Sequence, residues 1–154
     1  MNDKLQKTEQ ARKNVLKLYI GVLILNIIFL IASYILTNIL NITFEGVIDD
    51  TKLYFFQLIE VILLGTIPLS IFTFNNRIKK ANPEKTDEWC KSYITVANIR
   101  TAIVGQATIL NLFFYTICNQ ETFLYAGIIS LIAHIYIYPS KIELEKLLNG
   151  DTQK

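Results

Sequence analysis

The chain has 154 residues, of which 52% are hydrophobic and 18% are charged, with a formal net charge of +2. This length predicts one domain, and the low share of charged residues argues against an ordinary water-soluble domain. The net charge is too small to indicate a nucleic-acid partner. Cys90 and Cys118 lie at opposite ends of one expected helix, about 42 Å apart, so they cannot form a disulfide within one chain.

The first expected elements are a polar, basic surface helix over residues 1–16 and a membrane span over residues 17–40. The N-terminal stretch contains neither glycine nor proline, so we expect it to run directly into the span. Within the span, Tyr19, Asn26 and Ser33 recur every seven residues and therefore share one helix face. A secretory signal peptide is not expected, because the apolar run is too long and no small-residue cleavage site follows it.

A second span is expected over residues 53–74, and the spacing of Gln57 and Glu60 places both side chains on one face. Pro68 lies inside this span, removes a backbone N–H and predicts a kink. Beyond the span, we expect the helix to continue into the cytoplasm and to return through the polar start of the third helix as a protruding hairpin. The basic residues of this hairpin suit contact with anionic lipid headgroups and are Arg77, Lys79, Lys80 and Lys85.

A long third helix is predicted from Pro83 to Cys118, with its membrane span over residues 93–118 and with Asn82 as its N-cap. One face of this span carries small residues that allow close helix packing, and the opposite face carries bulky apolar residues. The small residues are Ala97, Thr101, Gly105 and Thr108, and the bulky ones are Ile99, Ile103, Leu110, Phe113 and Ile117. We therefore expect this helix to be the packing centre, with Trp89 and Tyr93 at the level of the lipid headgroups.

A fourth span is predicted over residues 121–138, with His134 on its polar face. Ser140 and Glu143 follow with the Ser-x-x-Glu spacing of a capping box. This motif predicts a short amphipathic tail helix over residues 140–148.

The basic residues are distributed very unevenly between the two sides of these spans. Thirteen lie in the N-terminal segment, the hairpin and the tail, whereas Lys52 alone lies on the other side and Arg100 lies within a span. This positive-inside bias predicts that both termini and the hairpin are cytoplasmic. The predicted fold is therefore all-α: a single domain over residues 1–154 that forms an integral membrane four-helix bundle.

Each span carries polar side chains that need a partner or a hydrated path inside a membrane. These candidates are Asn26, Gln57, Glu60, Arg100, Asn111 and His134. Their depths predict no tight ion pair between Glu60 and Arg100. We expect a neutral Glu60 that forms hydrogen bonds with Gln57 and Asn111, and an Arg100 that lies near the level of His134 or reaches cytoplasmic phosphates. A functional path and a purely structural network are both open interpretations at this point.

Three short motifs carry a resemblance. They are Ile67-Pro68-Leu69-Ser70 followed by Arg77 and Lys79-Lys80, Asn98-Ile99-Arg100-Thr101-Ala102 with Gly105, and Tyr138-Pro139-Ser140-Lys141 before an acidic-apolar helix. Together they resemble a group of small four-span membrane proteins found in Bacteroidetes, over about two-thirds of the chain. Members of that group often carry an acid one turn beyond the arginine of the third helix, where Gly105-Gln106 stands here. The resemblance implies the architecture and a bacterial inner membrane, and it implies no biochemical activity.

The sequence favours a non-enzymatic accessory, assembly or interaction protein, because no phosphate-binding loop, zinc motif or catalytic triad spacing is recognisable. No cofactor or metal is expected. The expected partners are the lipid bilayer, anionic headgroups, and either further copies of the chain or another membrane protein. One alternative is a small oligomeric transporter or channel that uses Glu60. A second alternative is a lipid-modifying membrane enzyme.

Overall fold

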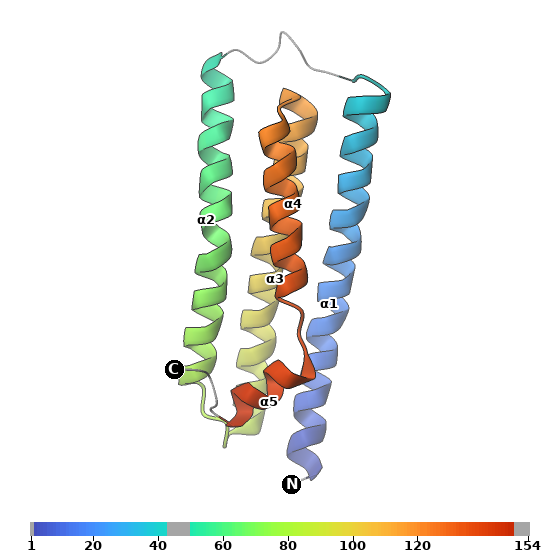
Figure 1. The fold of residues 1–154 in the computed structure, drawn as a ribbon. Coiled ribbons are helices and arrows are strands. Elements are labelled where there is room, and N and C mark those ends of the chain that lie inside the picture. Colours follow the sequence, from blue (N-terminus) through green and yellow to red (C-terminus); the bar gives the residue numbers. More distant parts are fainter. Residues whose placement is uncertain (1, 43–49, 150–154) are drawn as a thin grey trace.

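The computed structural model describes residues 2–42 and 50–149, and within these ranges the regular structure is entirely helical (Figure 1). The elements are α1 (Asn2–Tyr34), a π-helical turn η1 (Ile35–Ile39), α2 (Asp50–Lys80), α3 (Thr86–Cys118), α4 (Glu121–Tyr136) and α5 (Lys141–Asn149). The all-α prediction is confirmed for this part of the chain. The expected surface helix runs directly into the first span as α1, and the last residues of that span form η1.

Three helices, α1, α2 and α3, are each long and apolar enough to cross a membrane. The helix α4 has 16 residues and ends at Tyr136, two residues before the predicted end of the fourth span. It is followed by α5 at a bend of 61°, and the two helices pass the same test only when they are taken together. By length and composition, the described residues thus contain three helices that could cross a membrane, or up to four.

The helix α3 lies at the centre of the packing and contacts α1, α2 and α4 (Figure 1). Its small-residue stripe is buried, and its bulky residues Ile99, Leu110 and Phe113 are exposed. The buried stripe consists of Ala97, Thr101, Gly105 and Thr108. At Gly105 the approach of α1 is so close that an added Cβ would overlap Val22 Cγ1. Small side chains on α3 therefore set the distance between the two helices.

The helix α3 begins at Thr86, so the prediction of a start at Pro83 was wrong. The side-chain oxygen of Asn82 accepts a hydrogen bond from the Glu84 N–H at 2.9 Å, and the Lys85 N–H donates to the Asn82 carbonyl at 3.2 Å. These bonds fold residues 82–85 into a tight turn, because asparagine side chains readily bond to the backbone two residues ahead. Asn82 therefore shapes the connection between α2 and α3 rather than capping α3.

One end of the molecule brings together the N-terminal half of α1, the connection between α2 and α3, and α5 (Figure 1). We call it the basic end, because it carries the predicted basic segments. Its hydrophobic core consists of Ala11, Val15, Phe74, Ile78, Trp89, Tyr93, Val96, Ala97, Leu144 and Leu147. The hairpin is thus not an isolated protrusion, since α1 and α5 pack against it.

Trp89 and Tyr93 lie inside this core, and their predicted position at the level of the lipid headgroups stays a prediction. Both rings are almost completely buried, and they stack with centroids 5.4 Å apart. The physical reason is that α1 and α5 cover this face of α3, which the periodicity of α3 alone cannot reveal.

The helix α2 continues through Pro68 as one element, and the Pro68 ring lies on its exposed side. Two hydroxyl groups near the proline bond back to the helix: Thr66 Oγ1 donates to the Leu63 carbonyl at 2.6 Å, and Ser70 Oγ donates to the Ile67 carbonyl at 2.7 Å. The predicted kink therefore does not divide the helix.

Candidate functional site

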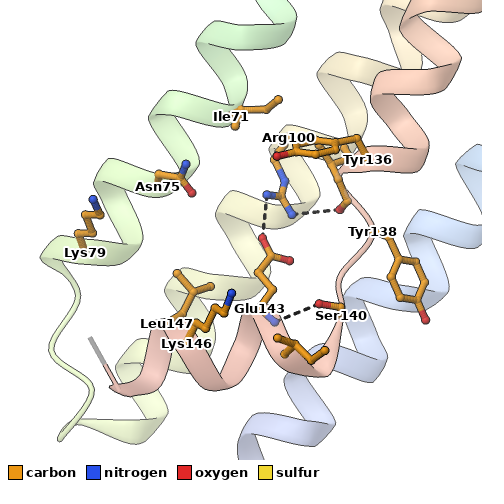
Figure 2. A pocket seen from close by; sticks show the side chains of 12 residues that line it. Ile71, Asn75, Lys79, Arg100, Tyr136, Tyr138, Ser140, Glu143, Lys146 and Leu147 are labelled. Atoms are coloured by element: carbon orange, nitrogen blue, oxygen red, sulfur yellow. Dashed lines mark hydrogen bonds and ion pairs between the residues drawn. The ribbon is translucent and has the colours of Figure 1, made fainter. Parts of the chain in front are cut away.

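The first polar site lies where α3, α5 and the segment after α4 meet, and Arg100 is at its centre (Figure 2). Arg100 Nη1 donates to Glu143 Oε1 at 3.2 Å, and Arg100 Nη2 donates to the Ile137 carbonyl at 3.2 Å. The guanidinium also lies over the Phe74 ring, with Cζ 3.7 Å from the ring centroid. Arg100 is thus held within the chain by an ion pair, a carbonyl and a cation–π contact, and its expected contact with phosphates stays a prediction.

The capping box at the start of α5 positions Glu143. The Glu143 N–H donates to Ser140 Oγ at 3.0 Å, as the sequence predicted. In a complete capping box the Glu side chain would return to the Ser140 N–H, but that N–H donates to the Tyr138 carbonyl at 2.8 Å. The carboxylate is therefore available to Arg100, and α5 is joined to α3 through it.

The pair between Arg100 and Glu143 leaves hydrogen-bonding capacity unused. Arg100 Nε and Glu143 Oε2 are buried and have no hydrogen-bond partner among the described residues. A guanidinium has five N–H donors and binds carboxylates or phosphates best in a two-pronged geometry. Burial raises the pKa of Glu143, while Arg100 opposes this effect. The pair therefore leaves one donor of Arg100 and one acceptor of Glu143 unsatisfied.

A cavity of about 530 Å³ adjoins this pair (Figure 2). Its charged lining consists of three cationic side chains, Arg100, Lys79 and Lys146, and one anionic side chain, Glu143. Polar groups from Asn75 and Ser140 also line it, and the remaining residues are Ile71, Tyr136, Ile137, Tyr138, Ile142 and Leu147. Three positive charges against one negative charge make the cavity attractive to an anion.

The predicted basic hairpin residues lie in different places. Lys79 lines the cavity beside Arg100, whereas Arg77 and Lys80 line a separate hollow of about 450 Å³. Lys85 forms an exposed ion pair with Glu88 at 3.4 Å. The basic residues of the hairpin thus lie in different local environments and do not form one uniform basic patch.

The second polar site lies between α1 and α4, where Asn26 and His134 are completely buried. Asn26 Nδ2 and His134 Nδ1 are 3.1 Å apart, and the Tyr19 hydroxyl donates to the His134 carbonyl at 3.1 Å. His134 Nε2 has no hydrogen-bond partner among the described residues. A Cβ at Gly105 would lie 3.8 Å from His134 Cε1, so this site adjoins the close contact between α1 and α3.

Glu60 belongs to neither site. Asn111 is completely buried, and neither of its amide atoms has a hydrogen-bond partner in the described ranges, so the predicted bond from Glu60 to Asn111 was wrong. Glu60 and Gln57 lie half-buried on α2. The expectation that Glu60 and Arg100 are not paired agrees with the ion pair that Arg100 makes to Glu143.

Sequence reasoning missed Glu143 as the partner of Arg100 and Lys146 as a lining residue of the same cavity. The capping-box spacing identified Glu143, but only as a helix-capping residue. The sequence did contain a pattern that indicates a shared site. Glu143 and Lys146 lie three residues apart and share one face of the tail helix, with Leu147 nearby.

Replacing Asn26 with Ala should lower the free energy of unfolding in detergent by about 1–2 kcal/mol, because the buried His134 Nδ1 loses its partner. Asn14→Ala on the exposed side of α1 is the matched control and should have an effect of less than about 0.5 kcal/mol. The measurement is a denaturant titration followed by circular dichroism. Equal stability of the two variants would contradict a structural role for the contact between Asn26 and His134.

Among the described residues, no group of three or more His, Cys, Asp or Glu side chains is arranged to hold a metal ion. Comparisons of the chain with protein-family models, with curated proteins and with solved structures find no match. The function is therefore argued from the chemistry of the chain's own residues.

Proposed function

We propose that the chain is a multi-pass integral membrane protein in which α1 to α4 form a four-span bundle and α5 lies at the membrane surface. The lengths and compositions of α1, α2 and α3 support this proposal directly. The helix α4 would extend about 24 Å, and the residues that follow it supply the remaining distance across a core of about 30 Å. Four of the nine residues of α5 are charged, namely Lys141, Glu143, Glu145 and Lys146, which keeps α5 out of the hydrocarbon.

The basic end is proposed to face the cytoplasm. Among the described residues, twelve basic residues belong to the segments of this end, and Lys52 belongs to the other. Such an asymmetry is the main determinant of orientation for short loops. The resemblance to small four-span proteins supports a bacterial inner membrane as the location.

Within this arrangement, the chain acts as a non-enzymatic accessory or assembly protein. It presents the surface of the basic end, which we call the platform, to another membrane protein or to a second copy of itself. The observation that carries this proposal is the core at the basic end, which joins α1, the hairpin and α5 into one surface. A transporter that uses Glu60 is less well supported, because Glu60 lies apart from both polar sites and on a half-buried face of α2.

Cysteine labelling tests the proposed orientation. In a chain without Cys90 and Cys118, we introduce Asp50→Cys or Lys85→Cys, which are both exposed positions at opposite ends. A membrane-impermeant maleimide should label Asp50→Cys in intact cells and should label Lys85→Cys only after the membrane is opened. Labelling of Lys85→Cys in intact cells would contradict the orientation.

Cross-linking in native membranes tests the accessory role. Amine-reactive cross-linkers should join the exposed lysines of the platform, Lys13, Lys85 and Lys91, repeatedly to one membrane protein or to a second copy. Cross-links that remain within one chain would contradict the accessory role and would leave the orientation result unaffected.

A further inference from the structure

We propose that the cavity beside Arg100 binds the phosphate of an anionic phospholipid headgroup. The proposal rests on the membrane orientation given above and names a ligand class for the basic end. The binding groups are Arg100, Lys79 and Lys146, which come from α3, α2 and α5 and line one cavity (Figure 2).

The size and lining of the cavity suit such a ligand. Its volume of about 530 Å³ lies within the range of roughly 300–1,000 Å³ that is common for ligand sites. Basic side chains meet apolar ones in its walls, with Ile71 and Ile142 among the latter. A phospholipid presents the same combination, because a charged phosphate is attached to apolar chains.

The level of the cavity in the membrane favours a lipid over a free anion. The cavity lies at the end of α4, where Tyr136 is 80% exposed and Tyr138 is also exposed. Exposed tyrosines mark the boundary between the hydrocarbon and the headgroups, and lysines beside them extend toward the water. A phosphate bound between Lys79 and Lys146 would therefore lie where lipid phosphates already are.

The geometry of Arg100 provides the specific contact. Its guanidinium is almost completely buried, and Nε has no partner in the part of the chain that the structure describes. Glu143 uses one carboxylate oxygen on Arg100 and leaves the other unpaired. A phosphate offers several acceptor oxygens and can bind a guanidinium through two of them, so it competes with Glu143 for Arg100.

The test measures binding of phosphatidylglycerol to the purified full chain in detergent, with phosphatidylcholine as the uncharged comparison, by native mass spectrometry. Lys79→Gln combined with Lys146→Gln should weaken phosphatidylglycerol binding about 25-fold, taking about fivefold for each lysine. The matched control is Lys80→Gln combined with Lys141→Gln, which removes the same charge from α2 and α5 but outside the cavity. This control should weaken binding less than about threefold by long-range attraction alone.

Glu143→Gln supplies a second measurement, because it keeps a hydrogen-bonding group beside Arg100 and removes the competing charge. It should strengthen phosphatidylglycerol binding about fivefold. Unchanged or weaker binding would contradict the role of Arg100 as the phosphate ligand.

Two further outcomes would overturn the proposal. Equal losses of phosphatidylglycerol binding in the cavity variant and in its matched control would show diffuse electrostatic attraction without a specific site. Binding of inorganic phosphate as tight as that of phosphatidylglycerol would show a site for free anions. Neither outcome affects the labelling result, so failure of this inference is distinguishable from failure of the proposed membrane orientation.

Discussion

Arg100→Met should lower the free energy of unfolding in detergent by about 3 kcal/mol. Removing one partner of a buried ion pair costs about 3–5 kcal/mol, because the other charge remains buried without compensation. We expect the lower end of this range of costs, because the Glu143 side chain is 29% exposed. The Ile137 carbonyl also loses its donor, and the Phe74 ring loses a cation. A denaturant titration followed by circular dichroism measures the change.

The second substitution Glu143→Met separates the ion pair from packing. In the Arg100→Met background it removes the unpaired carboxylate, so it should recover at least half of the lost stability. No recovery would show that packing around Arg100, rather than the uncompensated charge of Glu143, causes the loss.

The loss of stability in the Arg100→Met variant should also depend on pH. Burial already raises the pKa of Glu143, and removing Arg100 removes the effect that opposes it. The folded variant then binds a proton more tightly than the unfolded chain does. The variant is therefore stabilised as the pH falls, and its deficit against the parent should shrink toward acid pH. A deficit that is constant with pH would contradict an uncompensated carboxylate.

Gly105→Leu should prevent correct packing or lower the free energy of unfolding by about 3 kcal/mol or more. The first added carbon already overlaps Val22 Cγ1, and the rest of the side chain would extend toward Asn26 and His134. Overpacking usually costs about 1–3 kcal/mol, and leucine exceeds the space here by several carbons. Thermal unfolding in detergent and gel filtration measure the loss.

Two comparisons make the Gly105 prediction specific. Gly65→Leu places the same side chain on α2, where an added Cβ meets nothing within 4 Å, so it should change stability by less than about 1 kcal/mol. Gly105→Ala should be destabilising by about 1 kcal/mol, and Val22→Ala should relieve the overlap in the double variant. Equal effects of leucine at positions 65 and 105 would show that α1 and α3 do not meet closely at Gly105.

Periodicity in the sequence was sufficient to predict the helices and their faces. The stripe from Ala97 to Thr108 distinguishes the buried side of α3 from the bulky side that carries Phe113, because small residues at helical spacing allow close approach. The Ser140 cap of α5 was also predictable, since a capping bond involves residues only three positions apart. Such features depend on local backbone geometry, which the sequence encodes directly.

The contacts between distant segments were decided by the tertiary structure alone. The periodicity of α3 cannot show that α1 and α5 cover Trp89 and Tyr93, because it describes a helix face and not what covers that face. Depth estimates likewise argued against a tight pair between Arg100 and Glu60 but did not identify Glu143, which is 43 positions away from Arg100. That pair exists because the chain bends by 61° after α4 and returns α5 across the end of α3. The sequence by itself thus determined which helices form and which sides they bury, and the return of α5 determined where the basic residues meet.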